Sequence, residues 1–229
     1  MIHQLIFAAP KPGMSVQEFQ RYWVEEHAVR YAAKIPQIKR YAVDTTIPQP
    51  GENALWSGVA EIWLENEEEQ LASLQTPEFL EGARLDEPRW AAFWQSVVLD
   101  TDTEVLVQGE PESAVQPGVK LIVLGKRREG MTREEFRRYS RRMHVPMITG
   151  LPGVRRFYQS FTRDAWYSVS EPPFDVAYHI WFDDLAAVAA ARQAPAMAAV
   201  LDDRRHFLNE HYVHTLLVRQ HWIIGPEAR

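Results

Sequence analysis

Short apolar runs alternate with segments whose apolar residues recur every three to four positions, and these two patterns predict strands and helices. The run 3–9 is bounded by prolines and a glycine, which indicates a strand that ends in a turn. In the next segment, Phe19, Tyr22, Trp23 and His27 share one face of a helix. We expect this face to point inward.

The remaining elements follow from the same patterns and from cap residues. We predict further strands at 38–47, 55–64, 96–107, 120–126, 154–163, 174–182 and 212–224, and helices at 133–147 and 185–192 and after Asn66, Thr76 and Ala194. Asp183 is the expected cap of the helix at 185–192. Each half then has the order β-α-β-β-α-β, which is the ferredoxin-like order.

The first helix start occurs twice. Gly13-Met14-Ser15 and Gly130-Met131-Thr132 each precede a glutamate three positions after the hydroxyl residue, the spacing of a capping box. His27 and His144 lie 117 positions apart (144 − 27), and so do the two glycines (130 − 13). The chain is therefore an internal duplication.

The duplication predicts the fold class and the domain organisation. We expect an α+β protein with an N-terminal repeat at 1–108, a linker at 109–118 and a C-terminal repeat at 119–229. Because an open sheet with helices on one face leaves its other face bare, the two sheets should cover each other. The expected architecture is an intramolecular α+β barrel that functions as a monomer with an internal pseudo-dimer, and higher association stays open.

Composition narrows the possible partners. The 229 residues are 46% hydrophobic and carry a formal charge of −6, which argues against general binding to nucleic acid or to an anionic membrane. The chain has no cysteine, and we see neither a signal peptide nor an apolar run long enough to span a membrane. We expect a cytoplasmic protein with a small-molecule ligand.

The repeated motif resembles that of the EthD family in the dimeric α+β barrel superfamily. Each repeat begins with Lys or Arg, one further residue, the pair Gly-Met, and then Ser or Thr. Glu-Phe and Tyr follow at the family spacing. The histidine, a Leu-Pro or Ile-Pro pair and a later Ile-Trp pair come after them. The resemblance implies two ferredoxin-like units of the kind that usually pair as a homodimer. Relatives in the superfamily include isomerases, cyclases, quinone-forming monooxygenases and haem-degrading enzymes, and the fold does not choose among them.

His27 and His144 are the first candidates for chemistry, because a histidine near a cavity can exchange protons near neutral pH. The family pattern His-x-Pro is kept by His144-Val145-Pro146 and lost after His27. The alternative is a structural histidine that binds a backbone carbonyl at the helix end. Both interpretations stay open.

The two repeats differ where function should have diverged. Glu61 answers to His179, Trp23 to Ser140, and Asp44 to Ser160. We therefore place the main ligand cavity in the C-terminal half, between its first helix and its sheet. The candidate catalytic residues are His144, His179, Tyr139 and His27, and the candidate ligand-binding residues are Tyr158, Trp181, Tyr22, Trp23, Trp63 and Ser160.

Other features favour no cofactor and no metal. His206, His211 and His214 match no metal-binding spacing, and we see no phosphate-binding loop or dinucleotide fingerprint. Arginine pairs such as Arg137-Arg138 lie among glutamates, which favours an ordinary solvated face.

The leading hypothesis is a cofactor-independent enzyme that moves protons on a small apolar cyclic or aromatic metabolite, as an isomerase, cyclase, dehydratase or other lyase. His144 would act with His179 or Tyr139. The alternatives are a non-catalytic small-molecule-binding or stress-linked protein, a haem-binding protein and a quinone-forming monooxygenase.

Overall fold

The computed structural model describes residues 1–49, 54–109 and 118–225. Most of the linker expected at 109–118 lies outside these ranges. The chain forms two compact units that do not coincide with the two sequence repeats. The first unit takes in residues up to Asp102 and, near the other end of the chain, residues from Val218 on. The second unit contains most of the chain between Thr103 and Leu217.

The N-terminal repeat follows the predicted order of strands and helices. Its elements are β1 (Ile2–Ala8), α1 (Val16–Tyr22), η1 (Trp23–His27), α2 (Ala28–Arg30), η2 (Ala32–Lys34), β2 (Arg40–Thr46), β3 (Gly58–Leu64), α3 (Glu67–Ser73), η3 (Glu78–Ala83), α4 (Arg84–Asp86), η4 (Glu87–Arg89), η5 (Phe93–Gln95) and β4 (Val97–Val107).

The C-terminal repeat has the same order of strands and main helical segments, and the short helix α7 lies between β6 and β7. Its elements are β5 (Val119–Arg127), α5 (Arg133–Tyr139), η6 (Ser140–His144), α6 (Val145–Thr149), β6 (Arg156–Thr162), α7 (Asp164–Tyr167), β7 (Val176–Phe182), α8 (Leu185–Gln193), α9 (Pro195–Asp203), η7 (Arg204–His206) and β8 (Leu208–Ile224).

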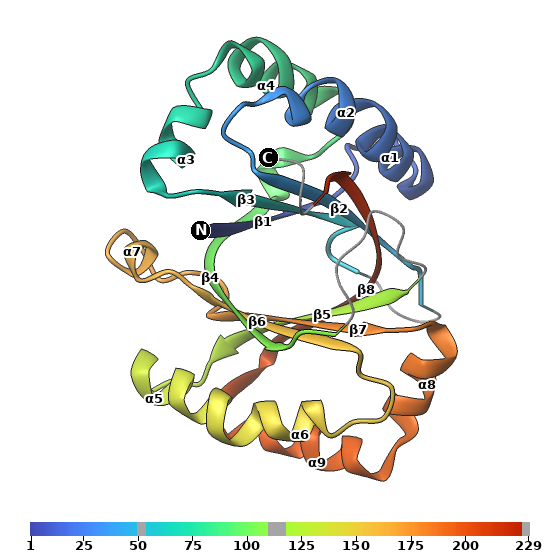
Figure 1. The fold of residues 1–229 in the computed structure, drawn as a ribbon, viewed down its shortest axis with the longest axis vertical. Coiled ribbons are helices and arrows are strands. Elements are labelled where there is room, and N and C mark those ends of the chain that lie inside the picture. Colours follow the sequence, from blue (N-terminus) through green and yellow to red (C-terminus); the bar gives the residue numbers. More distant parts are fainter. Residues whose placement is uncertain (50–53, 110–117, 226–229) are drawn as a thin grey trace. The chain divides into compact units, whose positions relative to one another are not determined.

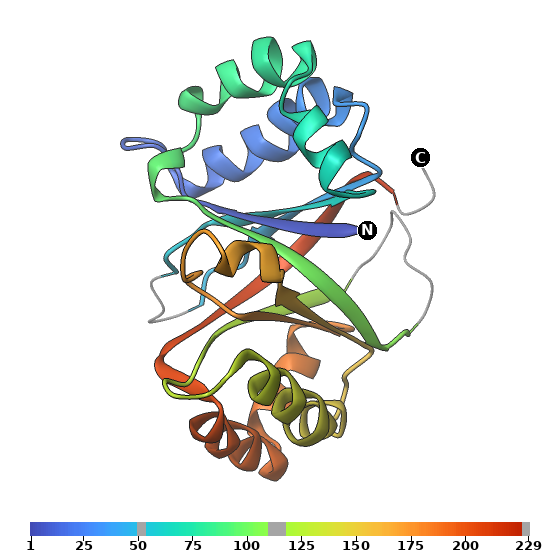
Figure 2. The same cartoon turned by 90° about the vertical axis from the view of Figure 1, so that its left-hand side faces the viewer.

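The hydrogen-bonded strand order is β1-β3-β2-β8-β5-β7-β6-β4, and it closes on itself. All the described pairings are antiparallel. Figure 2 shows β4, in green, and β8, in red, as long continuous strands. Each of the two begins in one compact unit and ends in the other, so the two units exchange strand segments. This strand order confirms the predicted α+β fold with two ferredoxin-like repeats.

Helices cover one face of the sheet within each unit. In Figure 1, α1, α2 and α4 lie over β1, β2 and β3, while α5, α6 and α9 lie over β5, β6 and β7. The first unit packs its core under these helices, and Phe19, Trp23 and Trp90 are among its largest buried side chains. Because side chains alternate along a strand, every second residue of each strand points away from the helices.

Both capping boxes of the repeated motif are present, while two other predicted caps need correction: η3 has Pro77 and not Thr76 as its N-cap, and the cap of α8 is also shifted by one residue. Ser15 and Thr132 each form a capping box with the glutamate three residues later. The cap of α8 is Asp184, which accepts a hydrogen bond from the backbone N–H of Ala187 at 2.8 Å. The prediction of Asp183 was wrong by one residue, because Asp183 instead pairs with Arg155.

Candidate functional site

The same histidine geometry occurs in both units. In each repeat the first α-helix widens into a π turn, η1 or η6, that ends on His27 or His144. The imidazole Nδ1 of His27 lies 2.9 Å from Oδ2 of Asp86, and that of His144 lies 2.8 Å from Oδ2 of Asp203. The two histidines and Asp86 and Asp203 are buried.

A tyrosine completes each group. Tyr22 donates its hydroxyl to Oδ1 of Asp86 at 2.8 Å, and Tyr139 donates to Oδ1 of Asp203 at 2.7 Å. One carboxylate therefore holds both side chains that the first helix contributes. The predicted alternative of a backbone carbonyl as the histidine's partner does not describe this contact, since the partner is a carboxylate from the second helical segment.

Burial sets the charge state of these groups. It lowers the pKa of His144 to about 4, although the Asp203 carboxylate acts in the opposite direction. It lowers the pKa of His27 for the same reason, and it raises the pKa of Tyr139 to about 12 with help from Asp203. Near neutral pH each contact is thus a hydrogen bond from a neutral imidazole to a carboxylate, not an ion pair. The Nε2 atom of His144 is then the nitrogen that can accept a proton.

The units differ next to the histidine. In the first unit Trp23 fills the space over the sheet and donates its indole N–H to the hydroxyl of Tyr41 at 3.2 Å. The strand that faces Trp23 carries small residues. Ala60 is buried, and a Cβ atom at Gly58 would lie 2.8 Å from Trp23. In the second unit the helix carries the small residue, Ser140, and the strand carries the large one, Tyr178. Their hydroxyl oxygens lie 2.5 Å apart.

Two further polar side chains distinguish the second unit. Gln159 pairs with Tyr178 across the strands as Val43 pairs with Ala60, so a glutamine replaces a valine on the helix-facing side. Gln159 is fully buried, and within the described residues neither polar atom of its amide has a hydrogen-bond partner. Arg204 lies in the position of Glu87, and its charge acts on both His144 and Tyr178.

The other predicted residues of the second repeat lie on the opposite face of its sheet. Because Tyr178 points to the helices, His179 points away from them, as do Tyr158, Ser160 and Trp181. Tyr158 and His179 pack against Trp181, with ring centroids 4.7 and 6.1 Å apart, and Ser160 contacts Thr103 at 2.7 Å. The expected acid–base pair of His144 with His179 was therefore wrong, because the sheet separates the two side chains.

Cations accompany Trp181 on this face. Lys120 and Arg156 are its direct cross-strand partners, with Nζ of Lys120 and Cζ of Arg156 lying 4.9 and 5.0 Å from the ring. Both cations are buried.

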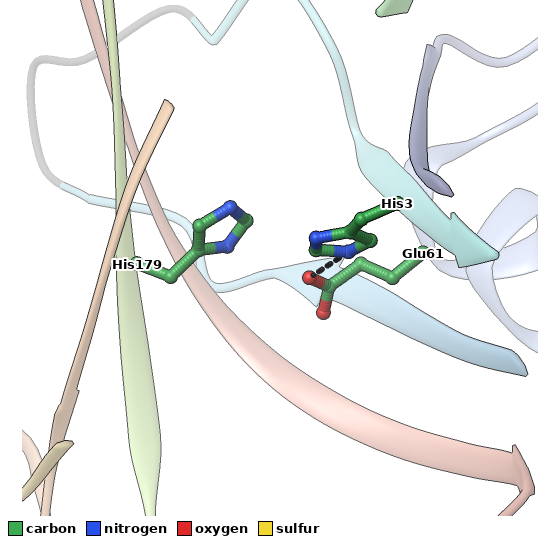
Figure 3. Close-up of side chains that lie close together, drawn as sticks. All are labelled: His3, Glu61 and His179. Atoms are coloured by element: carbon green, nitrogen blue, oxygen red, sulfur yellow. Dashed lines mark ion pairs between the residues drawn. The ribbon is translucent and has the colours of Figure 1, made fainter. Parts of the chain in front are cut away.

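The corresponding face of the first unit carries an ion pair that sequence reasoning missed. Nε2 of His3 lies 3.1 Å from Oε2 of Glu61 (Figure 3), and Gln220 donates to Oε1 of Glu61 at 2.6 Å. The His3 ring stacks on Trp63 at 4.3 Å, and Trp63 stacks on Trp222 at 5.5 Å. A buried imidazole and carboxylate are ligand types that a transition metal takes, and in this unit they offer two such ligands.

Some of the missed residues left a signal in the sequence. Asp86 and Asp203 each follow their histidine by 59 positions, and this equal spacing marks them as equivalent partners. The sequence signal is weaker for Gln159, Tyr178 and Arg204, because each of them is only one of many residues that differ between the repeats. No sequence pattern marked His3, which lies in an apolar strand.

The fold and the paired His–Asp–Tyr groups define a tandem ferredoxin-like α+β protein. The EthD domain matches residues 11–93 and again residues 128–211, so the chain belongs to the EthD family. No curated protein matches the chain. In the described part of the chain, no helix has the length and apolar character needed to cross a bilayer.

Solved structures with the same fold span almost the whole chain. An anthrone oxidase-like protein is 14% identical with a TM-score of 0.69, and the match covers 99% of this chain and 94% of that one. A candidate monooxygenase from Fusobacterium nucleatum is 9% identical with a TM-score of 0.62, covering 96% and 91%. A candidate chlorite dismutase is 11% identical with a TM-score of 0.52, covering 96% and 94%. At these identities the similarity establishes the fold alone.

Proposed function

We propose that the second unit binds a small cyclic or aromatic ketone between α5–η6 and its sheet and transfers a proton without a cofactor. His144 is the base, while Asp203 and Tyr139 hold its imidazole in place. The reaction class is isomerisation, cyclisation, dehydration or another lyase step.

One observation carries this proposal: the buried amide of Gln159. A buried amide without hydrogen bonds costs about 1–3 kcal/mol in folding free energy. The first unit avoids this cost with Val43, which belongs to the same buried core as Trp23. In the second unit Gln159 is the cross-strand partner of Tyr178 and its amide has no hydrogen-bond partner within the described residues, so a ligand carbonyl would supply the missing partner.

The surrounding groups suit abstraction of a proton next to a carbonyl. The Nε2 of neutral His144 takes the proton from carbon, and the electron pair of the C–H bond moves onto the carbonyl oxygen as an enolate. The hydroxyl of Tyr178, the NH₂ of Gln159 and the charge of Arg204 stabilise that oxygen. Return of the proton to another carbon completes an isomerisation, and loss of a leaving group completes a lyase step.

Anthrone, a planar ketone with an acidic methylene group, is a suitable probe, since one structure of this fold is of an anthrone oxidase-like protein. Exchange of its methylene protons in D₂O under anaerobic conditions can be followed by NMR. We expect the parent protein to accelerate exchange and His144→Ala to lower the enzymatic rate by roughly 10²- to 10⁴-fold. His27→Ala is the matched control and should stay close to the parent.

Gln159→Val introduces the residue of the first unit and tests the binding step. It should weaken anthrone binding, measured by quenching of tryptophan fluorescence, and leave the fold intact by circular dichroism. Binding without exchange would favour the non-catalytic binding protein over the enzyme. Equal exchange by His144→Ala and the parent would remove His144 from the mechanism.

A further inference from the structure

A row of arginines lies on another face of the α5–η6 helix. Arg133, Arg137 and Arg141 recur at every fourth position, and Arg138 and Arg142 follow beside the last two. They line an open groove of about 730 Å³ together with Thr132, Glu134 and Asp164. At 1.5 Å per residue the row extends for roughly 14 Å, which is longer than a single phosphate or carboxylate.

Three of these arginines are fixed in place. The guanidinium of Arg133 lies 4.6 Å from the ring of Tyr167, and those of Arg137 and Arg141 lie 5.5 and 4.9 Å from the ring of Phe161. Stacking on an aromatic ring orients a guanidinium and lowers the entropy lost when it binds a partner.

The row already binds carboxylates from other elements of its own unit. Asp164 accepts hydrogen bonds from Arg133 at 2.9 Å and from Arg137 at 3.3 Å. Glu104 accepts from Nε of Arg141 through both of its oxygens. Arg133 and Arg137 thus share one carboxylate and Arg141 binds a second, and the three arginines that bind them recur at one-turn spacing along the helix.

Arg138 and Arg142 remain exposed beside this row. The contact of Arg138 with Glu134 is 3.7 Å long, and within the described residues no ion pair or hydrogen bond involves the side chain of Arg142. The equivalent positions of the first repeat are Val16, Gln20, Arg21, Val24 and Glu25, so the arginine row is specific to the second repeat.

We infer that the arginine row is a docking surface for an acidic segment of another protein, with carboxylates one helical turn apart. This binding is separate from the proposed chemistry, which uses the helix face with Ser140 and His144. The formal charge of −6 for the whole chain favours a protein partner over nucleic acid, because a long polyanion would meet repulsion away from the row.

A fluorescein-labelled helical peptide with glutamates at positions i, i+4 and i+8 tests this inference by fluorescence anisotropy. The full-length protein should bind this peptide, and should bind the matched glutamine peptide much less. The double variant Arg138→Glu with Arg142→Glu should weaken binding by roughly tenfold or more, and added salt should act in the same direction. Arg21→Glu, the equivalent of Arg138 in the first repeat, is the control and should bind like the parent.

Three results would overturn the inference. The glutamate and glutamine peptides could bind equally, or the double variant could bind like the parent while circular dichroism confirms its fold. Tighter binding of duplex DNA than of the glutamate peptide would assign the row to a phosphate-bearing ligand instead.

Discussion

Trp23 and Ser140 occupy the same position of the repeat, and each fits the residue that faces it. The large indole lies over Gly58 and shares a core cluster with Ala60, while the small serine lies over Tyr178. Core volume is thus kept in both units by opposite choices on helix and strand. The change of Val43 to Gln159 has no such compensation within the described residues, which is why we assign it to ligand binding.

The exchange of sizes can be tested in the second unit. Ser140→Trp places an indole against Tyr178 and should lower the free energy of unfolding by about 1–3 kcal/mol through overpacking. Adding Tyr178→Ala should restore part of this loss, because it recreates the pair found in the first unit. Urea denaturation of both single variants and the double variant measures the coupling. If the change in unfolding free energy of the double variant equals the sum of the two single changes, the side chains at positions 140 and 178 do not compete for the same space.

At the scale of elements, the His–Asp pairs join the first helical segment of each repeat to the second. His27 connects η1 to α4, and His144 connects η6 to α9. The existence and order of these elements could be predicted, since periodicity and capping boxes are local signals. The cap at Asp184 was harder to predict, because two adjacent aspartates offer the same chemistry and only the tertiary contact of Asp183 with Arg155 separates them.

The histidine contacts should make stability depend on pH. The pKa of His144 is about 4 in the folded state and about 6.5 in an unfolded chain, so the unfolded state binds more protons between these values. The contribution of neutral His144 to the free energy of unfolding is therefore fully present above about pH 6.5. It is lost as the pH falls toward 4, and the loss is at most on the order of 3 kcal/mol. His27 acts in the same direction.

Urea denaturation at several pH values measures this dependence. The free energy of unfolding should decrease less between neutral pH and pH 4 in His144→Gln than in the parent protein. His27→Gln should reduce this decrease to a smaller extent. His211→Gln changes an exposed histidine and serves as the control. A parent protein whose unfolding free energy stays constant over this range would contradict the assignment of neutral buried imidazoles.

At the scale of the whole molecule, the two sequence repeats and the two compact units are different divisions of the chain. The duplication was visible from residue spacing, but the exchange of strand ends was not, because pairing between distant strands leaves no local pattern. The second half of β8 pairs with β2 from Val218 to Ile224, and β4 pairs with β1 from Val97 to Thr101. The first unit thus includes strand residues from the end of the chain.

Deletion of residues 218–229 should destabilise the first unit, since β2 would lose its neighbour and Trp63 would lose its contact with Trp222. We expect a loss on the order of 5–10 kcal/mol, comparable to the total stability of a small domain. Chemical denaturation followed by circular dichroism should then lack the cooperative transition of the parent. A peptide of residues 208–229 added in trans should restore part of it, and a truncated protein with the parent's midpoint would contradict the role of the exchanged strand.

The placement of β8 has a consequence for synthesis in the cell. A ribosome makes β2 well before the segment that pairs with it, Val218 to Ile224, because the whole second repeat up to β8 lies between them in the chain. Domains generally fold as they emerge, starting from the N-terminus. Here the nascent first unit must wait with one sheet edge unpaired, and an unpaired edge invites aggregation with other chains. The interval between translation of β2 and translation of the β8 segment that pairs with it is therefore the time when this protein most needs a chaperone.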